Sequence, residues 1–433
     1  MRRTCAIVAV LLALLAPAAH GADVLPPPAN TAPVLIPLVS NAANAAAVQR
    51  VLDRRLAGKG GTAVSAVVVD AATSTVVAGI DPGRGLAPAS TAKLLTAVAA
   101  LRTLGPESRF TTRVLVTGDH LVLDGGGDPT LVSNTPRAWR GKPPGTARPA
   151  ALSQLADDVA ASVDTARAWV VDVAADAAVG ERLAPTWTRG YVTGGYVQPV
   201  AGLALNASKD SGYVADPLRS AQRALVSALR ARGVDARAGS IVDAPTDAAP
   251  VAQVTSSPVS SIVERMLTTS NNTFAEYLAR HIAGFDSGTT VRQSAAAVVA
   301  SAGAAGVNVA DVSLRDASGL SAADRVSAST LVSVFSTASA GSDSTWLVFP
   351  ALPIAGVSGT LADRYPDAGR GYVRAKTGTL RGVVSLAGTV TTADGNVLFF
   401  AFILNGVRSV PAAQRVLDAT AAGLAACRCS GAT

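Results

Sequence analysis

The stretch LAPASTAKLLTAVAALRTLG, residues 86–105, places a serine and a lysine three residues apart at the start of an apolar helix. Pro88 ends the strand-like run before it, and the pattern predicts a helix that begins near Ser90. Residues three apart share one face of a helix, so Ser90 and Lys93 point the same way. The chain has only five lysines, at positions 59, 93, 142, 209 and 376. A lysine in this apolar helix is therefore either a chance occurrence or a sign that a hydroxyl and an amine are held together for chemistry.

The composition is that of a folded protein with an aliphatic core. The chain has 433 residues, of which 49% are hydrophobic, 15% charged and only 4% aromatic. This length predicts two or more domains. The formal net charge of +7 favours attraction to an anionic cell wall. No basic run carries interleaved aromatic residues, so we expect no nucleic-acid partner.

The N-terminus predicts export. Residues 1–21 have two arginines, a short apolar run and small residues at the end, as in a secretory signal peptide. Residues 22–43 form a Pro/Ala-rich lead-in. No later run is long and apolar enough for a transmembrane helix, so no membrane anchor is expected after signal cleavage. The sequence therefore predicts an exported protein that is periplasmic, extracellular or associated with the cell wall.

The two ends of the chain carry matching patterns. Strand-like runs cover residues 62–70, 74–80, 371–380, 382–392 and 396–406, and helical patterns cover 44–58 and 411–426. They predict one antiparallel sheet flanked by helices, an α+β fold with α/β/α layers, built from residues 44–105 and 251–433. Residues 106–250 mix a hairpin, helices and strands, and we interpret them as an inserted mixed α/β domain.

A serine nucleophile in this chain needs an unusual base. Only His120 and His281 remain after signal removal, each in a surface or helix-end pattern, and no G-x-S-x-G elbow is present. Lys93 can act as a base if its pKa falls from about 10.4 towards neutrality. Burial and a second cation can lower the pKa of a lysine, and Lys376 is the candidate for that cation.

Two further segments fit this chemistry. Ser270 and Asn272 precede a helical pattern; Ser270 could relay a proton between Lys93 and a leaving amine, and Asn272 offers a donor and an acceptor to an amide substrate. Lys376 is followed by Thr377 and Gly378 at the end of a β-branched run, where a glycine lets a ligand backbone approach.

Metal and cofactor sites are not expected. Besides Cys427 and Cys429 the mature chain offers only two histidines, too few for a zinc site. Residues 125–129, GGGDP, lack the strand-to-helix context of a phosphate loop. The two cysteines could close a disulfide, but the ring would be tight.

The three motifs S-x-x-K, S-x-N and K-T-G occur once each and in this order, which is the signature of penicillin-binding proteins and class A β-lactamases. The chain resembles the D-Ala-D-Ala carboxypeptidases of the low-molecular-mass class C penicillin-binding proteins, the penicillin-binding protein 4-like (peptidase S13) family. Segments such as GYVQPVAGLALNAS, LRDASGLSAADRVS, LPIAGVSGTLADR and AKTGTLRGVVSLAGTV carry the likeness beyond the motifs. The long gap between Ser90 and Ser270 also fits this family. The resemblance implies a β-lactamase/transpeptidase-like domain.

The resemblance also implies roles. Ser90 is the acylated nucleophile, Lys93 its general base, and Ser270, Asn272 and Lys376 complete the catalytic set, while Asn271 stands where many relatives have aspartate. Backbone N–H groups of Ser90 and Thr379 would hold the oxyanion. Thr377, Gly378 and Thr379 would bind substrate, the two threonine hydroxyls holding the terminal carboxylate. Peptidoglycan stem peptides would be the substrates, cleaved by carboxypeptidase and also endopeptidase action, and β-lactam antibiotics the inhibitors.

Two other functions stay open. A class A β-lactamase would need a glutamate for deacylation, and Glu181 lacks the expected asparagine partner nearby. A non-catalytic cell-wall binding protein would have no need of paired lysines. Asp316, Ser318 and Gly319 are interpreted as a turn next to the site that supports the Lys-Thr-Gly strand.

Overall fold

The computed structural model describes residues 42–56, 62–136, 148–175, 180–207, 212, 214–285, 287–341, 343–365 and 367–430. The expected signal peptide, residues 22–41 of the expected lead-in and the lysines at 59, 142 and 209 lie outside the described residues.

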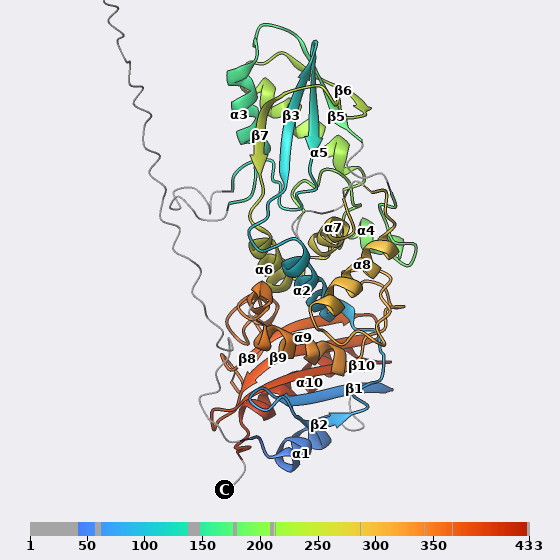
Figure 1. Cartoon of the computed structure of the whole chain (residues 1–433), viewed down its shortest axis with the longest axis vertical. Coiled ribbons are helices and arrows are strands. Elements are labelled where there is room, and N and C mark those ends of the chain that lie inside the picture. Colours follow the sequence, from blue (N-terminus) through green and yellow to red (C-terminus); the bar gives the residue numbers. More distant parts are fainter. Residues whose placement is uncertain are drawn as a thin grey trace, which may run out of the picture. The chain divides into compact units, whose positions relative to one another are not determined.

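The first sheet joins the two ends of the chain, as the sequence predicts (Figure 1). Its strand order is β2-β1-β10-β9-β8, and all neighbouring strands are antiparallel. The strands are β1 (Ala63–Asp70), β2 (Val76–Ile80), β8 (Val373–Leu380), β9 (Val383–Thr391) and β10 (Val397–Asn405). The lysine of the Lys-Thr-Gly triplet therefore lies on the edge strand, β8, opposite Ala387 of β9.

Both faces of this sheet are covered by helices. Alternate side chains of a strand point to opposite faces, and in β1 Ala66 and Val68 enter one core while Val67 and Val69 enter another. The first core packs against α1 (Ala45–Arg55) and α10 (Val410–Ala425). The second faces the remaining helices of the domain. The result is the expected α/β/α arrangement of an antiparallel sheet between helical layers.

The central helix of the second layer is α2 (Lys93–Thr103), and every residue from Lys93 to Leu101 is buried. A helix that is apolar all round must lie inside the protein. This explains why the stretch that begins at Ser90 has no polar face. Around it lie α6 (Val259–Thr269), α7 (Asn272–Ile282), α8 (Val291–Ala304), α9 (Ala328–Ala340) and the short 3₁₀ helices η1 (Ala89–Ala92) and η4 (Ser344–Val348). A third 3₁₀ helix, η5 (Gly359–Leu361), places Leu361 in the first core.

A second sheet is formed by the middle of the chain. Its order is β6-β5-β4-β3-β7, with β4, β5 and β6 parallel to one another and β3 antiparallel to both its neighbours, so the sheet is mixed. Helices α3 and α5 pack on it through a separate hydrophobic core. The elements are β3 (Thr111–Thr117), β4 (His120–Gly125), α3 (Leu152–Ser162), β5 (Trp169–Ala174), α4 (Arg189–Thr193), α5 (Pro217–Arg230), β6 (Ala236–Val242) and β7 (Pro250–Thr255). Strand β7 extends past residue 250, where the sequence placed the end of the insertion.

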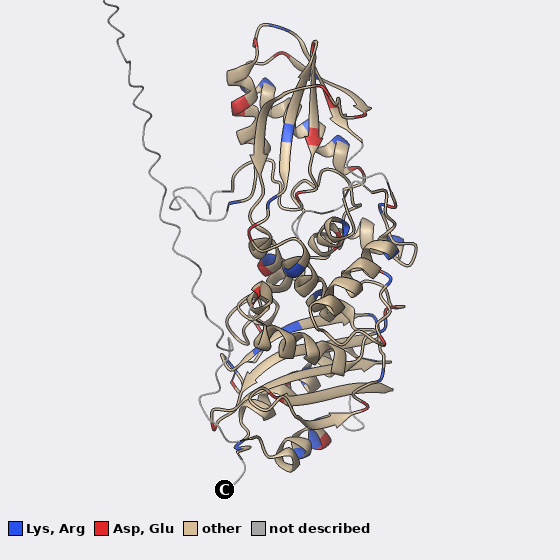
Figure 2. Ribbon diagram, in the orientation of Figure 1, with Lys and Arg blue, Asp and Glu red and all other residues tan. Residues whose placement is uncertain are grey.

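Basic and acidic residues are both scattered over the described elements, and most of the first sheet carries neither (Figure 2). None of the helices in the described part of the chain combines the length and apolar character that crossing a bilayer requires.

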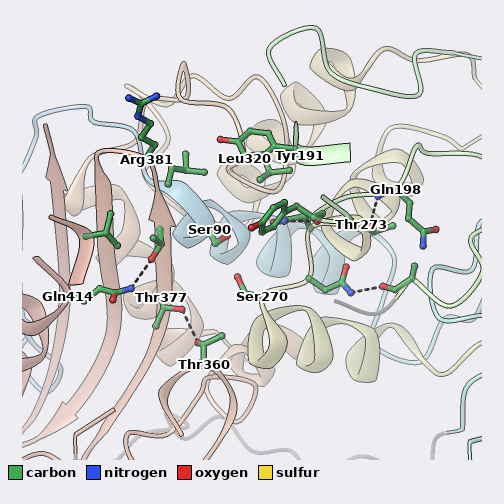
Figure 3. Close-up of a pocket in the computed structure, with 18 of the residues that line it drawn as sticks. Ser90, Tyr191, Gln198, Ser270, Thr273, Leu320, Thr360, Thr377, Arg381 and Gln414 are labelled. Atoms are coloured by element: carbon green, nitrogen blue, oxygen red, sulfur yellow. Dashed lines mark hydrogen bonds between the residues drawn. The ribbon is translucent and has the colours of Figure 1, made fainter. Parts of the chain in front are cut away.

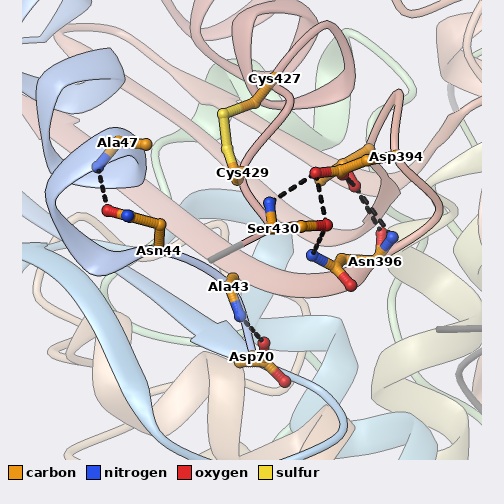
Figure 4. The surroundings of a disulfide bond; sticks show 10 residues. Ala43, Asn44, Ala47, Asp70, Asp394, Asn396, Cys427, Cys429 and Ser430 are labelled. Atoms are coloured by element: carbon orange, nitrogen blue, oxygen red, sulfur yellow. Dashed lines mark hydrogen bonds between the residues drawn. A yellow bond between two sulfur atoms is a disulfide. The ribbon is translucent and has the colours of Figure 1, made fainter. Parts of the chain in front are cut away.

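The segment after α10 is tied to the start of the described chain. Cys427 and Cys429 form a disulfide, and Ser430 donates its backbone N–H to the Asp394 carboxylate at 2.5 Å in the turn between β9 and β10 (Figure 4). Asn44 donates its backbone N–H to the Cys429 carbonyl, and Ala43 donates to Asp70 Oδ2 at 2.7 Å. The last residue of the expected lead-in, Ala43, is thus part of the folded core.

Candidate active site

Ser90 sits in a strained turn between two glycines. Ala89, just before it, has a φ of +49°, which non-glycine residues adopt only when their surroundings enforce it. A Cβ on Gly319 would lie 1.9 Å from the Ala89 carbonyl oxygen, and a Cβ on Gly378 would lie 2.8 Å from the Pro88 carbonyl oxygen. Only glycine fits at either place. The turn before Ser90 is therefore clamped from both sides, which fixes the position of the hydroxyl.

Gly378 lies against Ser385 and the Pro88 carbonyl, where the sequence suggested the backbone of a ligand. Its missing Cβ would fall 2.1 Å from Ser385 Oγ, and Ser385 donates to the Pro88 carbonyl at 2.5 Å. The space beside this glycine is thus occupied by the protein's own side chain and backbone. The glycine allows strand β8 to approach the Ser90 turn, whereas the sequence suggested an approaching ligand backbone.

Lys93 is fully buried, and its amine is surrounded by oxygen acceptors. Nζ donates to Ser90 Oγ at 2.9 Å, to Asn272 Oδ1 at 2.6 Å and to the Ser318 carbonyl at 2.5 Å. Burial lowers the pKa of Lys93 to about 7, although three nearby carboxylates oppose the shift. Those are Asp316, Glu276 and Asp324. The expected contribution of Lys376 to this lowered pKa stays a prediction.

Lys376 is the second fully buried lysine, and both lysines that the structure describes thus belong to this site. Its Nζ donates to Ser270 Oγ at 2.9 Å and to the Thr377 carbonyl at 2.7 Å. Lys376 of the Lys-Thr-Gly triplet and Ser270 of the S-x-N motif therefore meet in one site, as the sequence predicts. The two lysines hold different partners: Lys376 bonds to Ser270, and Lys93 bonds to Ser90 and Asn272.

The second motif forms the sharp connection between α6 and α7. Ser270 ends α6 with a left-handed φ of +58°, and Asn271 caps α7 by accepting from the Phe274 N–H at 3.0 Å. The Asn271 side chain also donates to the Ala207 carbonyl at 2.6 Å. A left-handed residue followed at once by a side-chain cap turns the chain within two residues. This turn presents Ser270 and Asn272 to the site.

The Asn272 amide is bonded within the protein at both ends. Its oxygen accepts from Lys93, and its Nδ2 donates to the Tyr196 carbonyl at 2.9 Å. The sequence suggested that this amide faces the substrate with both groups. In the structure it links the buried amine of α2 to the segment that follows α4.

Ser90, Ser270, Asn272 and Thr377 of the three motifs line one cavity of about 620 Å³ (Figure 3). Ser90 and Ser270 point into it from helices, and Thr377 lies opposite them on β8, where it donates to Thr360 Oγ1 at 2.8 Å. Thr379 is exposed at the same edge and accepts from Gln414 Nε2 at 3.3 Å. The helix face that carries the serine and the edge strand that carries the two threonines form its opposite walls.

The sequence did not assign several residues that line this cavity. The segment around α4 contributes Tyr191 and Tyr196, and the C-terminal half contributes Leu320, Thr360, Arg364, Arg381 and Gln414. Some of them lie in segments that carried the family resemblance, but no spacing or motif marks them. Neither His120 nor His281 is among the described residues that line it; His281 is stacked between Phe110 and Phe285, where burial lowers its pKa to about 4.

The turn at residues 316–319 packs against the start of α2. Its Ser318 carbonyl accepts from Lys93, and Gly319 packs against Ala89. These contacts attach the turn to the start of α2, and its expected support of the Lys-Thr-Gly strand stays a prediction. Asp316 holds the turn by accepting from the Gly319 N–H at 2.6 Å and also from Trp187 Nε1 at 2.7 Å.

A serine bonded to a buried lysine at the start of a buried helix, and a second buried lysine on the edge strand of an antiparallel sheet between helical layers, together define the β-lactamase and transpeptidase class of serine enzymes. The model of the D-Ala-D-Ala carboxypeptidase 3 (S13) family matches residues 48–216 and 206–426, and the chain belongs to this family.

Known relatives agree with this membership. The chain is 35% identical to carboxypeptidase Rv3627c of Mycobacterium tuberculosis, over 80% of the chain and 76% of the relative. It is 33% identical to carboxypeptidase DacB of Mycolicibacterium smegmatis, over 95% and 91%. Among solved structures, penicillin-binding protein 4 of Haemophilus influenzae superposes with a TM-score of 0.73 at 19% identity, over 87% of the chain and 98% of that protein. That protein has also been solved in complex with a β-lactam.

Proposed function

We propose that this protein is a serine-type D-Ala-D-Ala carboxypeptidase that trims peptidoglycan stem peptides through an acyl-enzyme on Ser90. The observation that carries the proposal is the environment of Lys93. A neutral amine has two N–H groups and one lone pair. Asn272 Oδ1 and the Ser318 carbonyl can take the two N–H groups, at 2.6 and 2.5 Å. The lone pair is then left for the hydroxyl of Ser90, at 2.9 Å.

Acylation follows from this geometry. Ser90 Oγ bonds to the carbonyl carbon of the penultimate D-Ala, and its proton passes to the Lys93 amine. The negative charge that develops on the carbonyl oxygen is stabilised by the backbone N–H groups of Ser90 and Thr379, aided by the positive end of α2. A pKa near 7 leaves enough neutral Lys93 to accept the proton at neutral pH.

The leaving amine needs a proton as its bond to the acyl carbon breaks. Ser270 can supply one from its hydroxyl, which accepts a hydrogen bond from Lys376. Lys93, which holds the proton taken from Ser90, then reprotonates Ser270 and becomes neutral again. Thr379 holds the terminal carboxylate of the departing D-Ala beside the cation of Lys376, and Thr377 joins it by turning its O–H from Thr360 to that carboxylate. Water then attacks the ester, and the neutral Lys93 amine accepts a proton from that water. The proton passes to Ser90 Oγ as the bond between the acyl carbon and Oγ breaks.

β-Lactams should acylate the same serine, since they present a reactive amide and a carboxylate in similar places. A β-lactamase would hydrolyse that ester quickly. Glu181, the glutamate considered for deacylation, accepts from the Val291 N–H at 3.1 Å and is not among the described residues that line the cavity. This favours a penicillin-sensitive peptidase over a β-lactamase. The paired buried lysines likewise favour an enzyme over a non-catalytic cell-wall binding protein.

The proposal places the protein outside the cytoplasm, in the periplasm or at the cell wall. The signal-like pattern of residues 1–21 supports this. So does the disulfide between Cys427 and Cys429, because such bonds persist in oxidising compartments. Peptidoglycan substrates would be met there, and the net charge, +7 for the whole chain and +5 without Arg2 and Arg3 of the signal-like segment, favours contact with an anionic wall.

Two measurements test the function together. Mass spectrometry after incubation with a labelled penicillin should find one label on the purified protein and none on Ser90→Ala. The wild-type protein should also release D-Ala from a peptide that ends in D-Ala-D-Ala, and a crosslinked dimer of such peptides tests for endopeptidase action. Folded protein that takes no label and releases no D-Ala would contradict the proposal. Fast, repeated hydrolysis of nitrocefin would favour the β-lactamase.

A further inference from the structure

A buried carboxylate supports the backbone that faces Lys93. Glu276 lies on α7, four residues after Asn272, and is only 3% exposed. Its Oε1 accepts from the Ser318 N–H at 2.8 Å and from the Ala317 N–H at 3.1 Å. The carbonyl of the same Ser318 accepts from Lys93. Ser318 therefore connects Glu276 to the Lys93 amine: its N–H bonds to Glu276 and its carbonyl accepts from Lys93.

The Ser318 carbonyl matters because the direction of the Lys93 lone pair depends on it. Asn272 and Ser318 provide the two acceptors that can engage the N–H groups of the neutral amine. A shift of the Ser318 carbonyl would rotate the amine or leave one N–H without a partner, and the lone pair would turn away from Ser90. Small misplacements of a reacting group cost large factors in rate.

We propose that Glu276 is a positioning residue for acylation: by binding two successive N–H groups, it holds the Ser318 carbonyl where that oxygen orients the Lys93 amine towards Ser90. The same helix also carries Asn272, so α7 contributes to the position of both acceptors, together with Asp316, which accepts from the Gly319 N–H of the Ser318–Gly319 peptide at 2.6 Å. This proposal rests on the proposed function.

The charges around Glu276 indicate how it performs this role. Lys93 faces it from α2, Asp316 and Asp324 from the loop before α9, and Arg280 from its own helix. Burial, and then the neighbouring Asp316, raise the pKa of Glu276 to about 8. The carboxyl can therefore be neutral at neutral pH and still accept through Oε1. A glutamine offers the same acceptor oxygen without an ionisable group.

The test compares Glu276→Gln with Glu276→Leu by pre-steady-state acylation with a labelled penicillin. The fraction of protein that takes the label gives the active fraction. We expect Glu276→Leu to lower the limiting acylation rate constant of that fraction at least about tenfold, with the apparent dissociation constant changed less than about threefold. Glu276→Gln should stay within about threefold of the wild-type rate constant. A role in folding alone would lower the active fraction and leave the rate constant unchanged.

Asp172 provides the matched control, because it is another buried carboxylate that accepts a backbone N–H, from Ser240 at 2.6 Å in the second sheet. Asp172→Asn and Asp172→Leu should leave the acylation rate constant unchanged. If Glu276→Leu does not fold, Glu276→Asp, with its shorter reach, should show the same loss of rate. Wild-type rates in Glu276→Leu, or an equal loss in Glu276→Gln, would overturn the proposal. Absence of label on the wild-type protein would instead contradict the proposed function.

Discussion

The Nζ atom of Lys93 lies 2.9 Å from the Oγ atom of Ser90, and the two residues belong to one turn of backbone where η1 runs into α2. Burial around this pair lowers the pKa of the amine to about 7. The same contact thus provides a nucleophile and a base that is partly neutral at neutral pH. Without Lys93 the Ser90 nucleophile would have no base, and without Ser90 the Lys93 base would have no proton to accept. Because the base titrates near neutral pH, the pH dependence of acylation tests this pair.

Acylation should depend on pH through Lys93. Only the neutral amine can accept the Ser90 proton, so the penicillin acylation rate should rise as pH increases through about 7 and level off above it. Well below pH 7 the rate should fall about tenfold per unit. Lys93→Arg should abolish acylation, because a guanidinium stays protonated. Stopped-flow acylation across this range is the measurement, and a flat profile would contradict the assignment of Lys93 as base.

Asn272→Asp should move that profile to higher pH. The new carboxylate would stand where Oδ1 now accepts from Lys93 at 2.6 Å. A negative charge at this distance favours the ammonium form and raises a lysine pKa by roughly 1–3 units. The variant should therefore acylate slowly at neutral pH and recover in alkaline buffer. Asn206→Asp, at an exposed asparagine outside the cavity, is the control. A uniform loss of rate at every pH would indicate another role for Asn272.

Gly319→Ala should displace the Ser90 turn. Gly319 has a φ of +79°, and its added Cβ would meet the Ala89 carbonyl oxygen at 1.9 Å. Gly371 offers a matched control, with a φ of +77° and open space around the added atom. Both variants carry a backbone cost of about 1 kcal/mol, and only Gly319→Ala adds overpacking of roughly 1–3 kcal/mol.

Chemical denaturation should therefore find Gly319→Ala the less stable of the two, and it alone should acylate slowly. Equal stabilities and equal acylation rates in the two alanine variants would show that the turn tolerates the extra atom.

The sheet was predictable because its strands carry a local signal. Residues 62–70 and 396–406 are β-branched and apolar runs bounded by turn residues, and β1 and β10 pair along their whole length. The order of strands in the second sheet could not be predicted in the same way. Parallel pairing, as between β4 and β5, depends on contacts between distant segments and leaves no local pattern.

The site was predictable only as far as side-chain types mark it. The three-residue spacing of Ser90 and Lys93, and the small number of lysines in the chain, indicate Ser90, Lys93 and Lys376 as site residues. The Ser318 carbonyl does not, because every residue has a carbonyl and only the fold brings this one to the amine. Glu276 was missed for the same reason, since it acts on backbone N–H groups of a turn distant in sequence. The direction of the Asn272 amide likewise depends on Tyr196, which belongs to another part of the chain.

Thr379 should recognise the terminal carboxylate of the substrate. It is exposed at the edge of β8, and its hydroxyl accepts from Gln414 Nε2 at 3.3 Å, which leaves its own O–H free to donate into the cavity. A hydrogen bond to a charged group contributes about 1.5–3 kcal/mol. Thr379→Val, which keeps the shape but not the hydroxyl, should therefore lower kcat/KM for a D-Ala-D-Ala peptide by about tenfold or more.

The comparison that isolates the carboxylate uses the same peptide with its terminal carboxylate converted to an amide. Wild-type protein should cleave this amide more slowly, and Thr379→Val should cut its kcat/KM much less than it cuts that of the acid. Thr379→Ser, which keeps the hydroxyl, should preserve the preference for the acid. If the valine variant lost the same factor on both peptides, the hydroxyl would have to act on the acyl group or the backbone, because the carboxylate is the only group that differs between the two substrates.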